Sequence, residues 1–190
     1  MPRYEILSEE SMATLTKGWR RIVSEIGIEF ASPWAVDMLK EAGQEVSGEN
    51  VKFDPDWILK QVAKAPQEFD LRARNPKRNV HIGGDAMVFG GVYGPPFVLE
   101  GSTRRDGTFK DFENFCKLAQ SYEVLDSVGG VVVEPNDLSL DSRHLDMAFA
   151  QATLTDKFFM GNVVSATNAK DVIAMAEIIH GGRKAIEETP

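Results

Sequence analysis

The sequence is poor in the features that mark several large classes of protein. It has one cysteine, Cys116, so no disulfide can form within the chain, and an intracellular, cytoplasmic setting is favoured. Cys116 lies on an apolar helical stripe and is interpreted as a small buried hydrophobe, not as a nucleophile. No apolar run approaches the roughly 20 residues that cross a bilayer, so no membrane partner is expected.

Basic residues are too few to balance the acidic ones. With 21 Lys and Arg against 29 Asp and Glu, the formal net charge is -8. This charge argues against a nucleic-acid partner, because such binding needs a basic face. The one dense basic run, residues 72–78, is interpreted as a solvated turn. The histidines lack zinc spacing and no cysteine lies near them, so we expect the chain to bind no metal.

Two further kinds of chemistry lack their sequence motifs. The chain has neither the G-x-x-x-x-G-K-[ST] phosphate loop nor the G-x-G-x-x-G dinucleotide fingerprint. It also has no serine within G-x-S-x-G. Neither nucleotide chemistry nor a serine hydrolase is therefore supported.

The most unusual segment that is present is Phe-Gly-Gly-Val-Tyr-Gly-Pro-Pro-Phe, residues 89–97. Glycine allows backbone conformations that a side chain forbids, and proline fixes φ, so the composition predicts a shaped loop. Phe89, Tyr93 and Phe97 can form an aromatic wall for an apolar or cationic ligand. The alternative is that Phe89 and Phe97 are ordinary core residues of short strands.

Residues 1–107 are predicted to form an N-terminal extension of helices and short strands. The apolar spacing predicts that helices come first, with a small hairpin among them, and that a β-rich cap follows. The predicted helices cover residues 8–26, 33–43 and 54–65, the hairpin covers 44–53, and the later strands cover 69–73, 80–82, 87–89 and 97–99.

Residues 108–190 follow the pattern of a parallel β/α fold. A capping box at Thr108–Asp111 predicts the start of a helix that runs to about residue 122. Two near-continuous apolar runs predict strands buried on both faces, and helices alternate with them. Two strands cannot close a sheet, so we expect the rest of it from residues beyond 190 or from another chain. The predicted strands are 128–133 and 158–164, and the later helices are 142–153 and 168–180.

Functional side chains in parallel β/α folds gather where the strands end. This rule selects Glu134 and Asn162, which follow or end the two predicted strands. The Glu134 carboxylate can face a cation or act as an acid or base, and the alternative is a cap or a salt bridge at the loop entry. His144, at the next helix start, can line the same site, and the alternative is a hydrogen-bonded packing residue.

Several segments, taken in their order along the chain, carry a resemblance to a known family. They are Ile22–Phe30, Ala73–Pro76, His81–Gly84, residues 89–97, Gly129–Pro135, Arg143–Asp146 and Thr155–Gly161. Together they resemble the trimethylamine methyltransferase family of corrinoid-dependent methyltransferases, over nearly the whole chain.

The resemblance implies an α/β fold, with an incomplete TIM-type (β/α) barrel that follows the N-terminal helical and β-rich extension. It implies transfer of a methyl group from trimethylamine, or from a quaternary amine such as glycine betaine, to the cobalt of a separate corrinoid protein. The corrinoid cofactor therefore belongs to a partner. Some members of the family carry pyrrolysine, at a position beyond the part that this chain matches.

The resemblance also suggests how the candidate residues divide the work. Aromatic faces bind quaternary ammonium groups well, so Phe89 and Tyr93 supply faces and Glu134 supplies charge, beside His144 and Asn162. The catalytic residues stay unassigned. Two alternatives stay open, which are a catalytically silent assembly segment of such an enzyme and an unrelated barrel enzyme. A homo-oligomer is also left open.

Overall fold

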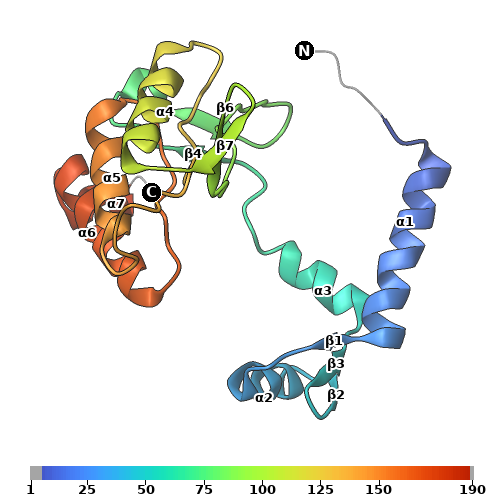
Figure 1. The fold of residues 1–190 in the computed structure, drawn as a ribbon. Helices are drawn as coiled ribbons and strands as arrows, with labels where there is room; N and C mark the ends of the chain where they lie inside the picture. The colour runs from blue at the N-terminus through green and yellow to red at the C-terminus, as the bar shows by residue number, and fades with distance from the viewer. Residues whose placement is uncertain (1–5, 189–190) are drawn as a thin grey trace. The chain divides into compact units, whose positions relative to one another are not determined.

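The computed structural model describes residues 6–188 of the chain (Figure 1). The chain divides into two compact units, residues 1–66 and 67–190, which are described separately below. Residues 67–107, which we assigned to the N-terminal extension, share the second unit with residues 108–190. The predicted boundary at residue 107 separates an extension from a barrel, whereas the division at residue 66 separates two compact units. The boundary at residue 107 stays a prediction.

The first unit opens with the long helix that the apolar spacing predicts. Helix α1, Glu9–Arg21, begins where the Ser8 hydroxyl accepts a hydrogen bond from the Ser11 N–H at 3.2 Å. It continues as a π-helical turn, Ile22–Ile26, and ends at Gly27. Gly27 has a φ of 84°, a conformation that favours glycine, and the helical run ends at residue 26 as predicted.

A small sheet and two more helices complete the first unit. Strands β1, Ile28–Glu29, β2, Glu45–Ser47, and β3, Asn50–Lys52, pair antiparallel in the order β1-β3-β2, which confirms the predicted hairpin. Helices α2, Pro33–Glu41, and α3, Pro55–Val62, both begin with proline at the first helical position. The core of the unit consists of Leu39, Val51 and Phe53, with Val23, Phe30, Val46, Trp57 and Ile58 packed against it.

Two antiparallel hairpins begin the second unit. Strand β4, Phe69–Leu71, pairs with β5, Val80–Ile82, and β6, Phe97–Glu100, pairs with β7, Thr103–Asp106. Strand β7 was not predicted, because its sequence is polar throughout. The predicted strand at 87–89 is wrong, since these residues lie in an irregular segment.

Four helices follow the hairpins. Helix α4, Phe109–Ser121, begins with the predicted capping box, in which Thr108 and Asp111 satisfy each other's backbone N–H groups. Helix α5, Arg143–Leu154, contacts both α4 and α6, Ala166–His180 (Figure 1). The short α7, Arg183–Glu188, was not predicted. No helix among residues 6–188 combines the length and apolar character that crossing a bilayer requires.

The segments predicted as buried strands at 128–133 and 158–164 do not form regular strands, so that prediction is wrong. They begin side by side in parallel, through a bridge between Ser127 and Phe158 and a hydrogen bond of 3.0 Å from Met160 N–H to Gly129 C=O. Side chains form hydrogen bonds with backbone groups that would otherwise pair with a neighbouring strand. Ser127 Oγ accepts the Gly129 N–H at 2.8 Å, and Gly129 itself has a φ of 83°.

The core of the second unit lies where α4 and α5 cover this irregular segment. Cys116 is fully buried there, and its burial raises the pKa of the thiol to about 12. The thiol stays protonated at neutral pH, in agreement with its interpretation as a packing residue. The core comprises Phe112, Cys116 and Ala119 of α4, Val128, Val131 and Val133, and Met147 and Ala150 of α5.

Candidate functional site

The aromatic loop runs alongside the segment 126–134. Phe89 C=O accepts the Asp126 N–H at 2.8 Å, and Val131 C=O accepts the Gly94 N–H at 2.6 Å. Further along, Pro95 C=O accepts the Glu134 N–H at 2.9 Å. Because the partners advance together along both segments, the two run in the same direction.

Glycines allow the two backbones to approach. A Cβ atom on Gly91 would lie 2.5 Å from Val128 C=O, and one on Gly129 would lie 2.9 Å from Gly91 C=O. Both distances are too short for a real side chain. The glycine-rich composition of residues 89–97 therefore serves close contact between main chains as well as loop shape.

Tyr93 is held at two points and is also exposed. Its ring lies against Gly130, where a Cβ atom would overlap the ring, and its hydroxyl donates to Gly161 C=O at 3.3 Å. The residue nevertheless remains 53% exposed. An aromatic ring that is fixed by its neighbours and still open to solvent suits an apolar or cationic ligand.

Glu134 forms an ion pair with Arg143, whose Nη2 lies 2.7 Å from its Oε2. The contact lacks hydrogen-bond geometry, so the pairing is electrostatic. The two side chains are mostly buried, with 24% of Glu134 and 18% of Arg143 exposed. The structure thus has the salt bridge that we weighed as the alternative for Glu134, and the carboxylate charge is already opposed by a cation.

His144 is buried between α5 and α6, with both ring nitrogens in contact with polar groups. Its Nε2 lies 2.9 Å from the Asp171 carboxylate, and its Nδ1 lies 3.1 Å from the Asn168 amide nitrogen. Only 4% of the residue is exposed. This is the geometry of the hydrogen-bonded packing residue that we weighed as the alternative role.

Asn162 and Phe89 have different surroundings. Asn162 is buried, directly after the Tyr93 contact at Gly161, and its Nδ2 lies 3.9 Å from Met147 Sδ. Phe89 is 44% exposed, and its N–H donates to the Asp126 carboxylate at 2.9 Å. Phe89 therefore sits where the paired segments begin, whereas Glu134 sits where they end.

The basic run 72–78 forms an exposed turn between β4 and β5, in agreement with our interpretation, and it also makes tertiary contacts. Arg74 donates to Thr155 C=O at 3.0 Å, and the Asn75 amide donates to the Asp156 carboxylate at 2.8 Å. Arg78 forms two hydrogen bonds of 2.9 Å with Glu123. The run ties the β4–β5 hairpin to the loops that follow α4 and α5. The hydrogen bonds from Asn75 and Gln120 also lower the pKa of Asp156.

Sequence reasoning missed Gln151, although it holds the segment that contacts Tyr93. Its amide nitrogen donates to Gly130 C=O at 2.6 Å and to Gly129 C=O at 3.2 Å. A signal was present in the sequence, because Gln151 lies seven residues after His144 on one helical face. A polar residue on a face that packs against the core calls for a partner.

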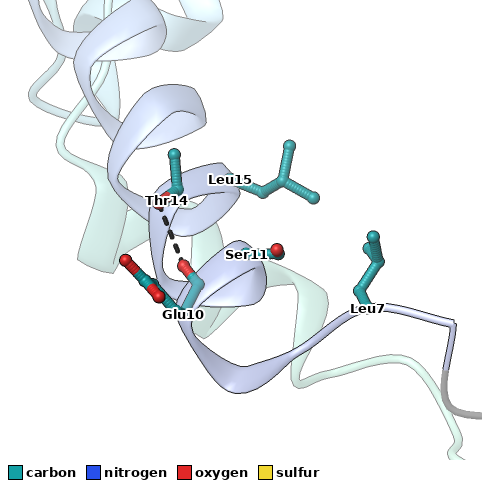
Figure 2. Close-up of a pocket in the computed structure, with 5 residues that line it drawn as sticks. All are labelled: Leu7, Glu10, Ser11, Thr14 and Leu15. Atoms are coloured by element: carbon teal, nitrogen blue, oxygen red, sulfur yellow. Dashed lines mark hydrogen bonds between the residues drawn. The ribbon is translucent and has the colours of Figure 1, made fainter.

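A surface hollow in the first unit lies over the start of α1 (Figure 2). The figure shows Leu7, Ser11 and Leu15 along its rim, and the Thr14 hydroxyl donating to Glu10 C=O at 2.9 Å. None of the predicted site residues lines this hollow. A single carboxylate beside two leucines gives it no recognisable chemistry.

Comparison with known proteins gives one family over the full length. Residues 1–190 match the family described as trimethylamine methyltransferase (MTTB). The chain is 38% identical, over its whole length, to a glycine betaine methyltransferase of Desulfitobacterium hafniense (strain Y51), and covers 40% of that relative.

Two more distant relatives have similar names. Over 79% of the chain, it is 26% identical to a proline betaine:corrinoid methyltransferase of Eubacterium limosum, of which it covers 31%. Over 96%, it is 23% identical to the trimethylamine methyltransferase MttB of D. hafniense (strain DSM 10664 / DCB-2), of which it covers 38%. The chain thus spans well under half the length of these relatives.

Proposed function

The chain belongs to the trimethylamine methyltransferase family, and on that premise we propose that it takes part in moving a methyl group from a quaternary amine to a corrinoid carried by a separate protein. The observation that carries this proposal is Tyr93. Its ring is fixed by Gly130 and Gly161 and is open to solvent. A cation over such a ring gains about 0.5–2 kcal/mol, depending on how well water is excluded.

The proposed substrate is a betaine, which carries a carboxylate as well as a quaternary ammonium group. Two of the three relatives compared are named for betaines. The Glu134–Arg143 pair supports the same class, because Arg143 balances the carboxylate. A simple ammonium ion would find no unpaired negative charge at this pair. A zwitterion can bind both residues, with its carboxylate on Arg143 and its ammonium group on Glu134.

The proposed division of labour differs from our expectation at four residues, which are Phe89, Glu134, His144 and Asn162. Tyr93 contacts the ammonium group, and the Glu134–Arg143 pair meets the carboxylate end. His144 and Asn162 act by packing, since both are buried and His144 already has polar contacts at both nitrogens. Phe89 lies at the other end of the paired segments, and we assign it no direct contact with the reacting methyl group.

In this proposal the corrinoid supplies the methyl-accepting chemistry and arrives on its own protein. The name of the proline betaine relative mentions a corrinoid for that protein. The task left to this chain is orientation. Holding a methyl group in line with an incoming acceptor lowers the entropic cost of the reaction. The residues around Tyr93 must therefore stay open to a protein partner.

We further propose that the second unit contributes the first β/α units of a TIM-type barrel. Two observations support this proposal. Segments 126–134 and 158–160 run parallel, and α4 and α5 pack over the first of them. Function in such barrels gathers where the strands end, and Glu134 follows the segment that we propose as the first of these strands.

The test compares the 190-residue chain with a fusion protein, in which the remainder of the D. hafniense glycine betaine methyltransferase follows this chain. Each is supplied with a reduced corrinoid protein and with glycine betaine, proline betaine or trimethylamine. We expect the fusion protein to demethylate a betaine faster than trimethylamine. Activity in the fusion protein alone indicates that the 190-residue chain is a silent assembly segment.

Two outcomes would contradict the proposal. One is a correctly folded fusion protein that transfers no methyl group from any of the three amines. The other is activity confined to a substrate without an amine, which would favour an unrelated barrel enzyme. A preference for trimethylamine would refute only the assignment of the betaine class.

A further inference from the structure

Gln151 occupies a position where a core residue is expected. It lies on the buried face of α5 with Met147 and Ala148, and only 1% of it is exposed. Its amide group donates to two consecutive carbonyls, those of Gly129 and Gly130. Without this donor, the Gly130 carbonyl would lose its 2.6 Å partner inside the core.

The peptide that Gln151 holds is the surface on which Tyr93 rests. The Tyr93 ring is the nearest side chain to Gly130. Any larger residue at position 130 would displace that ring. The φ of Gly130 is not in the left-handed region, so backbone conformation does not require glycine at this position. The requirement comes from the ring. A shift of the Gly129–Gly130 peptide would therefore shift Tyr93.

We propose that Gln151 is a positioning residue that sets the orientation of Tyr93 through the Gly129–Gly130 peptide. Its effect on substrate rests on the proposed function, in which Tyr93 contacts the ammonium group. Its effect on the ring does not. Helix α5 thereby connects the core of the second unit to the exposed aromatic face, with one side chain and two carbonyls between them.

The first experiment measures Tyr93 directly, in the 190-residue chain. The sequence has three tyrosines, so incorporation of 3-fluorotyrosine gives a ¹⁹F spectrum of three signals. The signal of Tyr93 is assigned by its loss in Tyr93→Phe. Gln151→Met keeps the approximate length of the side chain and removes both donated hydrogen bonds. We expect this variant to shift or broaden the Tyr93 signal and to leave the other two unchanged.

Gln120→Met is the matched control. Gln120 also lies in the second unit, but its side chain is hydrogen-bonded to Thr155 and Asp156 and not to the carbonyls of Gly129 and Gly130. This variant should leave the Tyr93 signal in place. A Tyr93 signal that is unchanged in folded Gln151→Met, or that moves equally in Gln120→Met, overturns the inference.

A second variant covers the case in which Gln151→Met does not fold. Gly130→Ala leaves Gln151 in place and adds one methyl group beneath the ring, so it should move the Tyr93 signal by itself. If the signal stays where it was in Gly130→Ala, the ring does not rest on this peptide, and the inference fails.

Kinetics in the fusion protein separate this inference from the proposed function. If both hold, Gln151→Met and Tyr93→Ala each raise KM for glycine betaine by about fivefold or more, with kcat largely retained. If Gln151→Met moves the ¹⁹F signal while Tyr93→Ala leaves KM unchanged, Gln151 positions the ring and the role proposed for Tyr93 is refuted. If Tyr93→Ala raises KM and the folded Gln151→Met variant changes neither signal nor KM, only the positioning role is lost.

Discussion

Lys157 is the most deeply placed cation in the described part of the second unit. Its Nζ donates to the carbonyls of Ala119, Tyr122 and Leu125 at 2.8, 2.7 and 2.5 Å, and the residue is 1% exposed. These carbonyls belong to the last turns of α4 and to the loop behind it. A cation at the carboxyl end of a helix also complements the helix dipole. Lys157 therefore caps the carboxyl end of α4. The next residue, Phe158, begins the parallel pairing with Ser127.

Replacing Lys157 with Met tests this role. The substitution keeps the apolar stem and removes the three donors, so we expect the free energy of unfolding to fall by about 3 kcal/mol. Chemical denaturation followed by circular dichroism measures the change. Lys117→Met, on the exposed face of α4, is the control and should stay within about 0.5 kcal/mol of the parent. Equal effects in the two variants would show that the three hydrogen bonds contribute nothing.

Residue-scale roles depend on partners that lie far apart in the sequence, and this limited their prediction. The ion pair between Glu134 and Arg143 joins residues on either side of a loop, and the strand-end rule selected only the first of them. The Cys116 interpretation depended on local spacing alone, and it agrees with the structure. The contact of Tyr93 with Gly130 needed the relative placement of two segments, which no spacing rule supplies.

At the scale of elements, the capping box of α4 is also an electrostatic cluster. Arg105, through its guanidinium hydrogen bonds, is the main cause that holds the pKa of Asp111 well below its usual value of 3.8, and Thr108 adds to the effect. A carboxyl group whose pKa is lowered by folding stabilises the protein fully above its unfolded pKa. That contribution is lost as the pH falls from near 4 toward the folded pKa.

The Asp111→Asn variant should therefore be less stable than the parent at pH 7, by about 1 kcal/mol from the lost cap, and the difference should shrink below pH about 4. Urea denaturation at a series of pH values measures this. Asp146→Asn, on the exposed face of α5, provides the comparison and should change stability by less than about 0.5 kcal/mol at every pH. An Asp111→Asn deficit that grows as the pH falls would contradict the expected direction of the pH dependence.

Helices were predictable because their signals are local, and irregular strands were not. The start of α4 follows from Thr108 and Asp111, which are three residues apart. The segment 128–133 has the composition of a buried strand, yet Ser127 and Gln151 take the backbone groups that a ladder would use. Strand β7 has no apolar alternation and is formed by its pairing with β6. Tertiary contacts thus decided the outcome wherever local preference was weak.

At the scale of the whole molecule, the two compact units have separate cores. Leu39, Val51 and Phe53 form the first, and the cluster around Phe112 and Met147 forms the second. Apart from Pro66 itself, the sequence gives little indication that the two units divide at residue 66. The family resemblance extended across this division, so it did not indicate where the chain separates into compact parts.

Separate cores predict separate unfolding transitions. The three tryptophans, Trp19, Trp34 and Trp57, all lie in the first unit, so their fluorescence reports on it alone. Val51→Ala should lower the free energy of unfolding of the first unit, followed by fluorescence, by about 2 kcal/mol. Met147→Ala should leave the fluorescence transition unchanged and should destabilise the second unit, whose unfolding is followed by circular dichroism. If both variants shifted a single shared transition, the units would unfold as one.

The central claim is that the Tyr93 face binds a methylated ammonium group. Its most direct measurement is KM for glycine betaine in the fusion protein, compared among the parent, Tyr93→Phe and Tyr93→Ala. The account predicts that the phenylalanine variant, which keeps the ring, stays within about twofold of the parent, and that the alanine variant raises KM about tenfold with kcat largely kept. An alanine variant with the KM of the parent would contradict it.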